Sequence, residues 1–162
     1  MKLERQIIET WKAHNRITMF VIGNIPDDAL SATLSVRGGR DIARQFAHVH
    51  MVRVWRLEAT SRKLAKGLVK FEKGTTPRRK QLLDALEQSG EAIERLLQHC
   101  IENDETTTNF KRQTIPTLGY LISHEAHHRG SIILTMKQSG FKLPDTLKWG
   151  VWDWRKFRQS QS

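Results

Sequence analysis

The sequence predicts an all-α protein folded as a four-helix bundle. Apolar residues recur at helical spacing in four long segments, which are separated by stretches rich in Gly, Pro and Thr. Alternating strand patterns followed by hairpin turns do not occur along the sequence. Residues 1–162 are predicted to form a single domain, long enough to bury a hydrophobic core. Helices of this length bury their apolar stripes most readily against one another.

The first helix is predicted over residues 3–21, because apolar side chains recur there every three or four positions. Gly23 and Pro26 are expected to end it, since Gly permits a C-terminal turn and Pro cannot continue a helix. The connection that follows is predicted to contain one short turn at residues 28–30.

The second and third helices each begin at a residue suited to a helix start. Asp41 is a plausible N-cap for a helix predicted over residues 41–69. Thr76 is placed to cap the next helix, with Pro77 at its first position. That third helix is predicted over residues 78–101, with a stripe of Leu and Ile side chains.

The fourth helix is predicted over residues 116–138, where Pro116 opens it and Ser139-Gly140 stops it. The polar, Thr-rich stretch 103–109 before it reads as a loop. The tail is predicted to be irregular chain that packs through its aromatic residues, which are Trp149, Trp152, Trp154 and Phe157.

Composition limits the classes of protein. No apolar run approaches the ~20 residues that cross a bilayer, and the first residues lack the apolar region of a secretory signal. Cys100 is the only cysteine and is expected to pack in a helix, so we predict a cytoplasmic protein. The net charge of +10 comes from scattered Lys and Arg clusters without interleaved aromatics. We therefore expect only nonspecific electrostatic binding of nucleic acid.

The chemistry is concentrated in residues 123–130, SHEAHHRG. This stretch contains H-E-x-x-H, the zinc-protease pattern, in which two histidines bind metal and the glutamate acts as base. Such a site needs a third ligand downstream, but no His or Glu follows His128. A protease is therefore not favoured, and a third ligand must come from a facing helix.

Helical spacing selects His124 and His128 as the metal-binding pair. Residues at i and i+4 lie about 5–6 Å apart, so both imidazoles can reach one ion. His127 points away from them and is expected at the surface or an interface. Glu125 and Arg129 fall within the apolar arc, where their spacing permits an ion pair beside the metal ligands.

The third ligand has four candidates, which are His14, His48, His50 and His99. His48 and His50 lie on opposite sides of the second helix, and both sides are apolar, so periodicity does not choose between them. The two apolar sides suggest that one packs in the bundle and the other against a second subunit. This pattern predicts a homodimer.

The two histidine stretches, 41–50 (DIARQFAHVH) and 124–132 (HEAHHRGSI), together with the ending 149–154 (WGVWDW), resemble the DinB/YfiT-like family. The resemblance covers the whole chain. It implies an up-down-down-up four-helix bundle, usually dimeric, with a divalent metal held by three histidines. These fall on His48, His124 and His128, and the choice of His48 over His50 rests on the resemblance.

Three imidazoles leave coordination positions open, as in catalytic sites, and imidazole ligands suit zinc or nickel. The resemblance implies a metal-dependent enzyme of the thiol S-transferase type, in which a low-molecular-weight thiol is activated at the metal and attacks a small electrophile. Hydrolysis is the other catalytic expectation. The alternative is a non-catalytic stress-response module that binds a small ligand or a partner.

Overall fold

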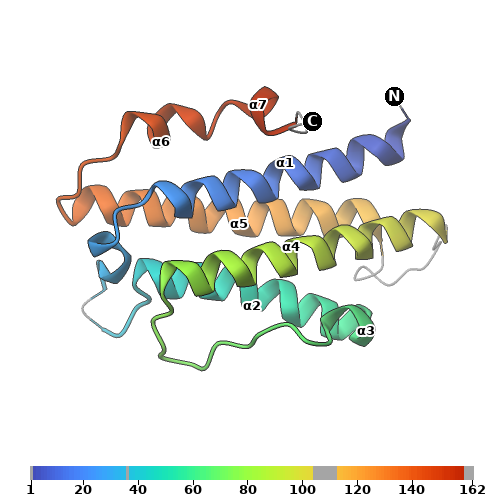
Figure 1. Cartoon of the computed structure of the whole chain (residues 1–162), viewed down its shortest axis with the longest axis horizontal. Coiled ribbons are helices and arrows are strands. Elements are labelled where there is room, and N and C mark those ends of the chain that lie inside the picture. The colour runs from blue at the N-terminus through green and yellow to red at the C-terminus, as the bar shows by residue number, and fades with distance from the viewer. Residues whose placement is uncertain (1, 36, 104–112, 159–162) are drawn as a thin grey trace.

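The computed structural model describes residues 2–35, 37–103 and 113–158, and the predicted loop at 103–109 lies outside them except for Asn103. All regular secondary structure within these ranges is helical. Four long helices lie side by side, α1 and α5 running in one direction and α2 and α4 in the opposite one (Figure 1). The predicted all-α bundle is confirmed. Its long helices are α1 (Leu3–Asn24), α2 (Ile42–Thr60), α4 (Arg79–Glu102) and α5 (Thr114–Gln138).

The first helix and the turn after it lie close to their predicted positions. α1 continues past Gly23 and ends before Ile25, whose backbone is extended with φ −81° and ψ 135°. The residue before a proline is biased away from helical geometry, so Pro26 rather than Gly23 sets this end. The predicted turn is confirmed as a 3₁₀ helix, η1 (Asp28–Ser31).

The second helix is shorter than predicted. Asp41 is its N-cap, and its Oδ1 accepts a hydrogen bond of 2.7 Å from the Arg44 N–H. The prediction that it reaches residue 69 is wrong, because Ser61 is extended and only the short α3 (Arg62–Ala65) follows. The chain then folds back so that the Val69 carbonyl accepts a 2.8 Å hydrogen bond from His50 Nε2.

Thr76 and Pro77 do not begin α4 as predicted. Helix α4 starts at Arg79, and the Arg78 N–H is bound at 2.9 Å by Oε1 of Gln81. Thr76 donates its hydroxyl instead to Asp41 Oδ2 at 2.9 Å. One carboxylate therefore caps α2 and fastens the loop that leads into α4.

The tail is more ordered than predicted. It forms two short helices, α6 (Asp145–Gly150) and α7 (Trp154–Arg158), which lie along α1 (Figure 1). Leu147 and Phe157 are buried in the core, whereas Trp149 and Trp152 are 65% and 75% exposed. The prediction that all four tail aromatics pack is therefore wrong, because Trp149, Trp152 and Trp154 are exposed.

None of the helices in the described ranges has the length and hydropathy needed to cross a membrane.

Apolar side chains form two core clusters, one toward each end of the bundle. The cluster near the N-terminal end of α1 contains Ile7, Trp11, Leu57, Ala92, Ile93, Leu96, Leu97, Cys100, Leu118 and Leu121. The larger cluster includes Ile17, Val21, Ile42, Phe46, Leu82, Leu86, Ile132 and Met136.

A buried layer of polar side chains separates the two clusters. Each long helix contributes to it: His14 and Thr18 from α1, Arg53 from α2, Ser89 from α4 and Glu125 from α5. On α2, α4 and α5 these residues fall between the positions that enter one cluster and those that enter the other, whereas on α1 they lie beside the first residues of the larger cluster. We call these five residues the polar layer.

Replacing the shared carboxylate by Asp41→Ala is expected to lower the free energy of unfolding by about 1 kcal/mol, because α2 loses its cap. Thr76→Val should remove only the loop contact and lower the free energy of unfolding by less than Asp41→Ala does. Urea denaturation followed by circular dichroism measures both. The control is Asp84→Ala, which removes an exposed pair with Lys80 and should change stability little. Equal effects of Asp41→Ala and Asp84→Ala would contradict the capping role.

Candidate metal centre

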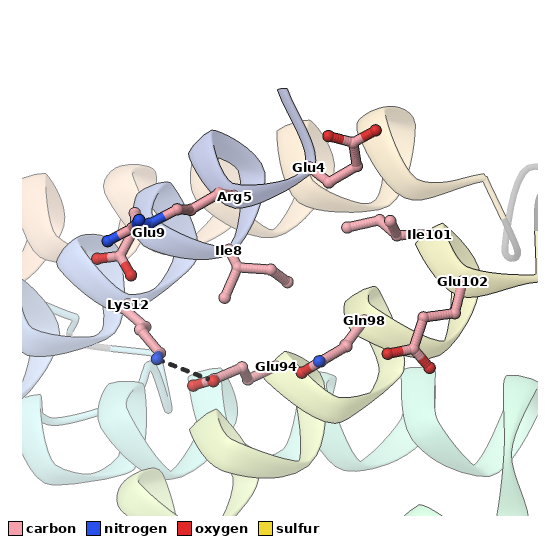
Figure 2. A pocket seen from close by; sticks show the side chains of 9 residues that line it. All are labelled: Glu4, Arg5, Ile8, Glu9, Lys12, Glu94, Gln98, Ile101 and Glu102. Carbon is pink, nitrogen blue, oxygen red and sulfur yellow. Dashed lines mark ion pairs between the residues drawn. The ribbon is translucent and has the colours of Figure 1, made fainter. Parts of the chain in front are cut away.

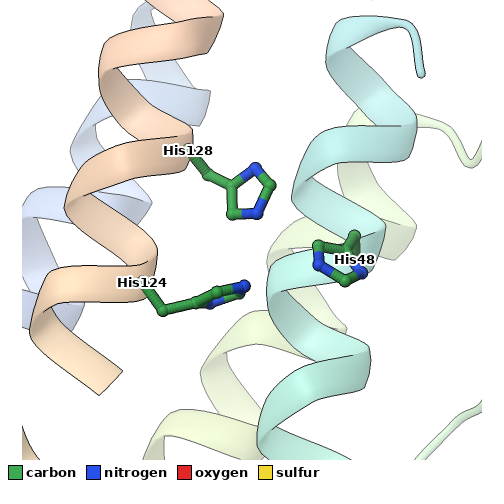
Figure 3. Close-up of side chains that lie close together, drawn as sticks. All are labelled: His48, His124 and His128. Carbon is green, nitrogen blue, oxygen red and sulfur yellow. The ribbon is translucent and has the colours of Figure 1, made fainter. Parts of the chain in front are cut away.

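Three histidines from two helices meet on one side of the bundle. His48 comes from α2, and His124 and His128 come from α5 (Figure 3). The ring centroids of His48 lie 5.3 Å from His124 and 4.9 Å from His128, and those of the α5 pair are 4.6 Å apart. Each ring offers one nitrogen, and the three nitrogens all lie within 4.8 Å of one another. The structure thus brings together the three histidines that the sequence analysis selected.

The other histidines of α1, α2 and α4 have separate partners. His50 is buried, with Nε2 donating to the Val69 carbonyl and Nδ1 lying 3.0 Å from the Ser89 hydroxyl. A neutral ring that donates through Nε2 accepts through Nδ1, so Ser89 donates to His50. His14 lies in the polar layer, and His99 Nδ1 is 2.9 Å from the Asn103 amide nitrogen. The hydrogen bonds of His50 to Val69 and Ser89 make it a structural residue of the fold.

Packing of His50 also bears on the predicted homodimer. Its ring lies 5.4 Å from that of Phe71, on the returning chain after α3. Phe46, Val54 and Leu57, which share its side of α2, are buried too. The His50 side of α2 is thus buried within one chain, whereas Trp55 on the His48 side is exposed, and the homodimer stays a prediction.

The three clustered imidazoles are held in the neutral state. Burial lowers the pKa of His48 and of His128 to about 4, and it lowers the pKa of His124 as well. The positive charge of Arg40 acts on all three in the same direction. A neutral imidazole has a lone pair to offer a metal, so the cluster keeps its donor form to a lower pH than an ordinary histidine.

The donor set fits a divalent metal ion. Ligand nitrogens of a tetrahedral zinc site lie about 3.3 Å apart, and the three ring nitrogens here all lie within 4.8 Å of one another. Nδ1 of His124 and Nδ1 of His128 are buried without a hydrogen-bond partner among the described residues. His127, on the same helix, is exposed and does not belong to the cluster.

Glu125 does not face this cluster and does not form the ion pair with Arg129 that the helical spacing permits. Its carboxylate is 1% exposed and is bound by two nitrogens of Arg53, with Nε at 2.7 Å from Oε1 and Nη2 at 2.7 Å from Oε2. Arg129 instead donates through Nη1 to the Thr18 hydroxyl at 3.1 Å. The pair within α5 does not form because α2 presents a better-placed guanidinium across the helix interface.

Further donors complete the environment of Glu125. His14 Nε2 lies 2.9 Å and the Thr18 hydroxyl 3.2 Å from Oε2. Burial would raise the pKa of Glu125, but the Arg53 charge and these hydrogen bonds outweigh it and hold the pKa well below its usual range. Burial lowers the pKa of His14, so His14 is neutral and donates a hydrogen bond rather than forming an ion pair.

Arg53 connects the polar layer to the remaining long helices. Its Nη1 donates to Asn15 Oδ1 and to the Leu86 carbonyl, both at 2.9 Å. Its guanidinium carbon lies 5.0 Å from the centre of the Trp11 ring. Helical periodicity and motif spacing did not identify Arg53 as a residue that builds the site. The available signal was a charged residue within the apolar stretch MVRVW of α2.

The Arg53–Glu125 pair joins the same two helices that supply the histidines. Arg53 follows His48 by five positions on α2, and Glu125 is the direct neighbour of His124 on α5. A bidentate pair fixes both the distance and the rotation of the helices it joins. The pair therefore sets how the rings of α2 and α5 face one another.

A hollow of about 400 Å³ lies away from the clustered histidines, between α1 and α4 (Figure 2). Its lining is mainly charged and includes Glu4, Glu9, Glu94 and Glu102. Lys12 and Glu94 form an ion pair of 3.2 Å across it. None of the clustered histidines lines this hollow, which reads as a solvated, charged surface.

Comparison with known proteins gives one match. The family model of the DinB family matches residues 1–152, so the chain belongs to the DinB family. No curated protein and no solved structure matches the chain significantly. The predicted family is confirmed.

Glu125→Gln is expected to lower the free energy of unfolding by about 3–5 kcal/mol, because Arg53 would remain buried without a carboxylate. Chemical denaturation of the metal-free protein measures this change. The matched control is Glu94→Gln, which breaks the half-buried, solvent-facing pair with Lys12 and should cost about 0–1 kcal/mol. Similar losses in the two variants would show that the buried pair does not stabilise the fold.

The stability of the metal-free protein should fall as the pH is lowered from about 6.5 toward about 4, because unfolded histidines take up protons that folded His48 and His128 do not. Urea denaturation at a series of pH values between about 5.5 and 6.5 measures the slope, because Glu125 is still largely ionised there in the unfolded chain as well. His48→Asn should reduce the slope and His127→Asn should not. A slope unchanged in His48→Asn would contradict the lowered pKa.

Proposed function

We propose that this member of the DinB family binds one divalent metal ion through His48, His124 and His128. The observation that carries the proposal is the convergence of three imidazole nitrogens within 4.8 Å of one another. Their lowered pKa values support it, as do the Nδ1 atoms of the α5 pair, which are buried and have no hydrogen-bond partner in the described part of the chain. Zinc and nickel are the ions that we expect, since both accept imidazole ligands.

We further propose that the bound metal serves catalysis. A divalent ion with three protein ligands supplies a Lewis acid that lowers the pKa of a coordinated thiol or water. The three histidines would hold the ion on one side, and the half-buried, partly solvent-facing position of their rings would leave the other side to reactants. We favour transfer of a small thiol to an electrophile over hydrolysis.

A non-catalytic module that binds a small ligand or a partner is the alternative. It makes the same use of the histidines but needs no exchangeable position on the metal. The buried polar layer would then serve stability only. Turnover distinguishes the two functions, whereas metal content does not.

Native purification followed by elemental analysis should find about one divalent ion per chain. His48→Ala and His124→Ala are each expected to lose most of it, because two imidazoles hold an ion much more weakly than three. His127→Ala is the matched control on the same helix and should keep the wild-type content. Unchanged metal content in both ligand variants would overturn the site.

Zinc-loaded and nickel-loaded protein should conjugate small thiols to monochlorobimane faster than the metal-free protein does. His48→Ala should abolish the metal-dependent part of the rate. Fluorescence of the conjugate measures it, and a parallel assay with activated esters tests hydrolysis. Stoichiometric metal with no metal-dependent turnover in either assay would favour the non-catalytic module.

A further inference from the structure

Three exposed tryptophans follow one another closely in the tail. Trp149 belongs to α6, Trp152 lies in the turn after it, and Trp154 begins α7. Their exposed fractions are 65%, 75% and 37% in that order. Single exposed apolar residues are ordinary, whereas several large ones gathered in one short segment indicate a contact surface. We call these three residues the tail tryptophans.

The fold holds the tail tryptophans in solvent. Leu147 and Phe157 anchor the two short helices in the larger apolar cluster, and Arg16 Nη1 on α1 donates to the Phe157 carbonyl at 2.7 Å. A Cβ added to Gly150 would lie 2.6 Å from Cζ of Phe20, so α6 packs closely against α1. The apolar side chains of this segment are thus divided into buried anchors and outward tryptophans.

Basic side chains accompany the tail tryptophans. Residues 145–158 expose four basic and two acidic side chains, which are Lys148, Arg155, Lys156, Arg158, Asp145 and Asp153. In the described part of the chain, no ion pair involves any of the four basic residues. The tail therefore presents an excess of positive charge together with its indoles.

The arrangement of charges and indoles suits the surface of an anionic bilayer. α6 and α7 lie along α1 and form the outer edge of the molecule on that side (Figure 1). Lys156 Nζ lies over the rings of Phe20 and Phe157, at 5.5 Å and 5.9 Å from their centres. Indoles favour the headgroup region of a bilayer, and Lys and Arg favour its anionic phosphates. An outer edge of this kind can reach both without a cleft.

Two other occupants fit this surface less well. A single-stranded nucleic acid would stack its bases on the indole faces, but the Lys148 ammonium lies 4.8 Å from the centre of the Trp149 ring. A second copy of the chain would bring the same excess of positive charge against itself across a twofold axis. An anionic bilayer complements the indoles and the charge at once.

We propose that the tail tryptophans and the basic residues among them form a peripheral membrane-binding surface that selects anionic lipid. The chain lies on the bilayer through α6 and α7 without crossing it, because the indoles reach only the headgroup region. The inference is independent of the proposed metal site, whose ligands come from α2 and α5.

Co-sedimentation of the full chain with lipid vesicles tests this surface. Vesicles of equimolar phosphatidylcholine and phosphatidylglycerol should bind the protein about tenfold or more tightly than vesicles of phosphatidylcholine alone, because several Lys and Arg side chains act near the anionic headgroups. Tryptophan fluorescence should shift to shorter wavelength on binding, as the indoles leave water. Failure to bind the anionic vesicles, or equal binding to both compositions, would overturn the proposal.

The contribution of the indoles is tested by replacing Trp149→Ala and Trp152→Ala together, which should weaken binding to the anionic vesicles several-fold. Trp55→Ala is the matched control, because it removes an indole that is 51% exposed on α2, and it should bind as the wild type does. Circular dichroism checks that the variants fold. Equal binding of the double variant and the control would show that the tail tryptophans are not the contact.

The contribution of the charge is tested by Lys148→Gln with Arg155→Gln, which should weaken binding to the anionic vesicles about tenfold. Arg62→Gln with Lys63→Gln removes two exposed charges from α3 and should have a much smaller effect. Equal losses in the two double variants would reduce the binding to a general effect of net charge and overturn a defined surface.

The other occupants have their own measurements. Binding of poly(dT) should be weak and unchanged in Trp152→Ala, and sedimentation velocity should give the same oligomeric state for the wild type and this variant. Loss of poly(dT) binding in Trp152→Ala would assign the surface to nucleic acid. Dissociation of a wild-type dimer by the same substitution would assign it to a second copy, and either result would overturn the membrane surface.

Discussion

The ion pair between Arg53 and Glu125 is the interaction on which the arrangement of the bundle depends. Both side chains are almost completely buried, so each charge is stable only because the other is present in bidentate geometry. The remaining hydrogen-bonding capacity is satisfied by α1 and by the backbone of α4. Because the pair lies next to the clustered histidines on α2 and α5, the geometry of the candidate metal centre depends on the same contact that holds the core together.

The features that were predicted correctly from the sequence depend on interactions between residues a few positions apart. Periodicity predicted four long helices, and Asp41 was identified as a cap, because both signals act over a few residues. Spacing likewise selected His124 with His128. The end of α2 near Ser61 was missed, because the chain turns back there to place Val69 against His50, a partner distant in sequence. His48 was separable from His50 only through the family resemblance, since both stand on apolar sides of one helix.

The buried pair was not predictable from spacing at all. Glu125 and Arg129 are correctly placed for a pair within one helix, but a guanidinium from α2 reaches both carboxylate oxygens in the dry interior. Sequence spacing favours an ion-pair partner that is close along the chain. In a buried site, the favoured partner is instead the one that leaves the fewest polar groups without a hydrogen bond. In the H-E-x-x-H pattern, the histidines thus face one side of α5 and the glutamate stabilises the other.

The division of the core by the polar layer also limits which packings the chain can adopt. Two purely apolar stripes can slide past each other by one helical turn, about 5.4 Å, at modest cost. Here such a slip would move Glu125 out of reach of Arg53 and place an unpaired charge against hydrocarbon. Competing registers are thereby raised in free energy far above the native one. The polar layer therefore favours a single alignment of the four long helices.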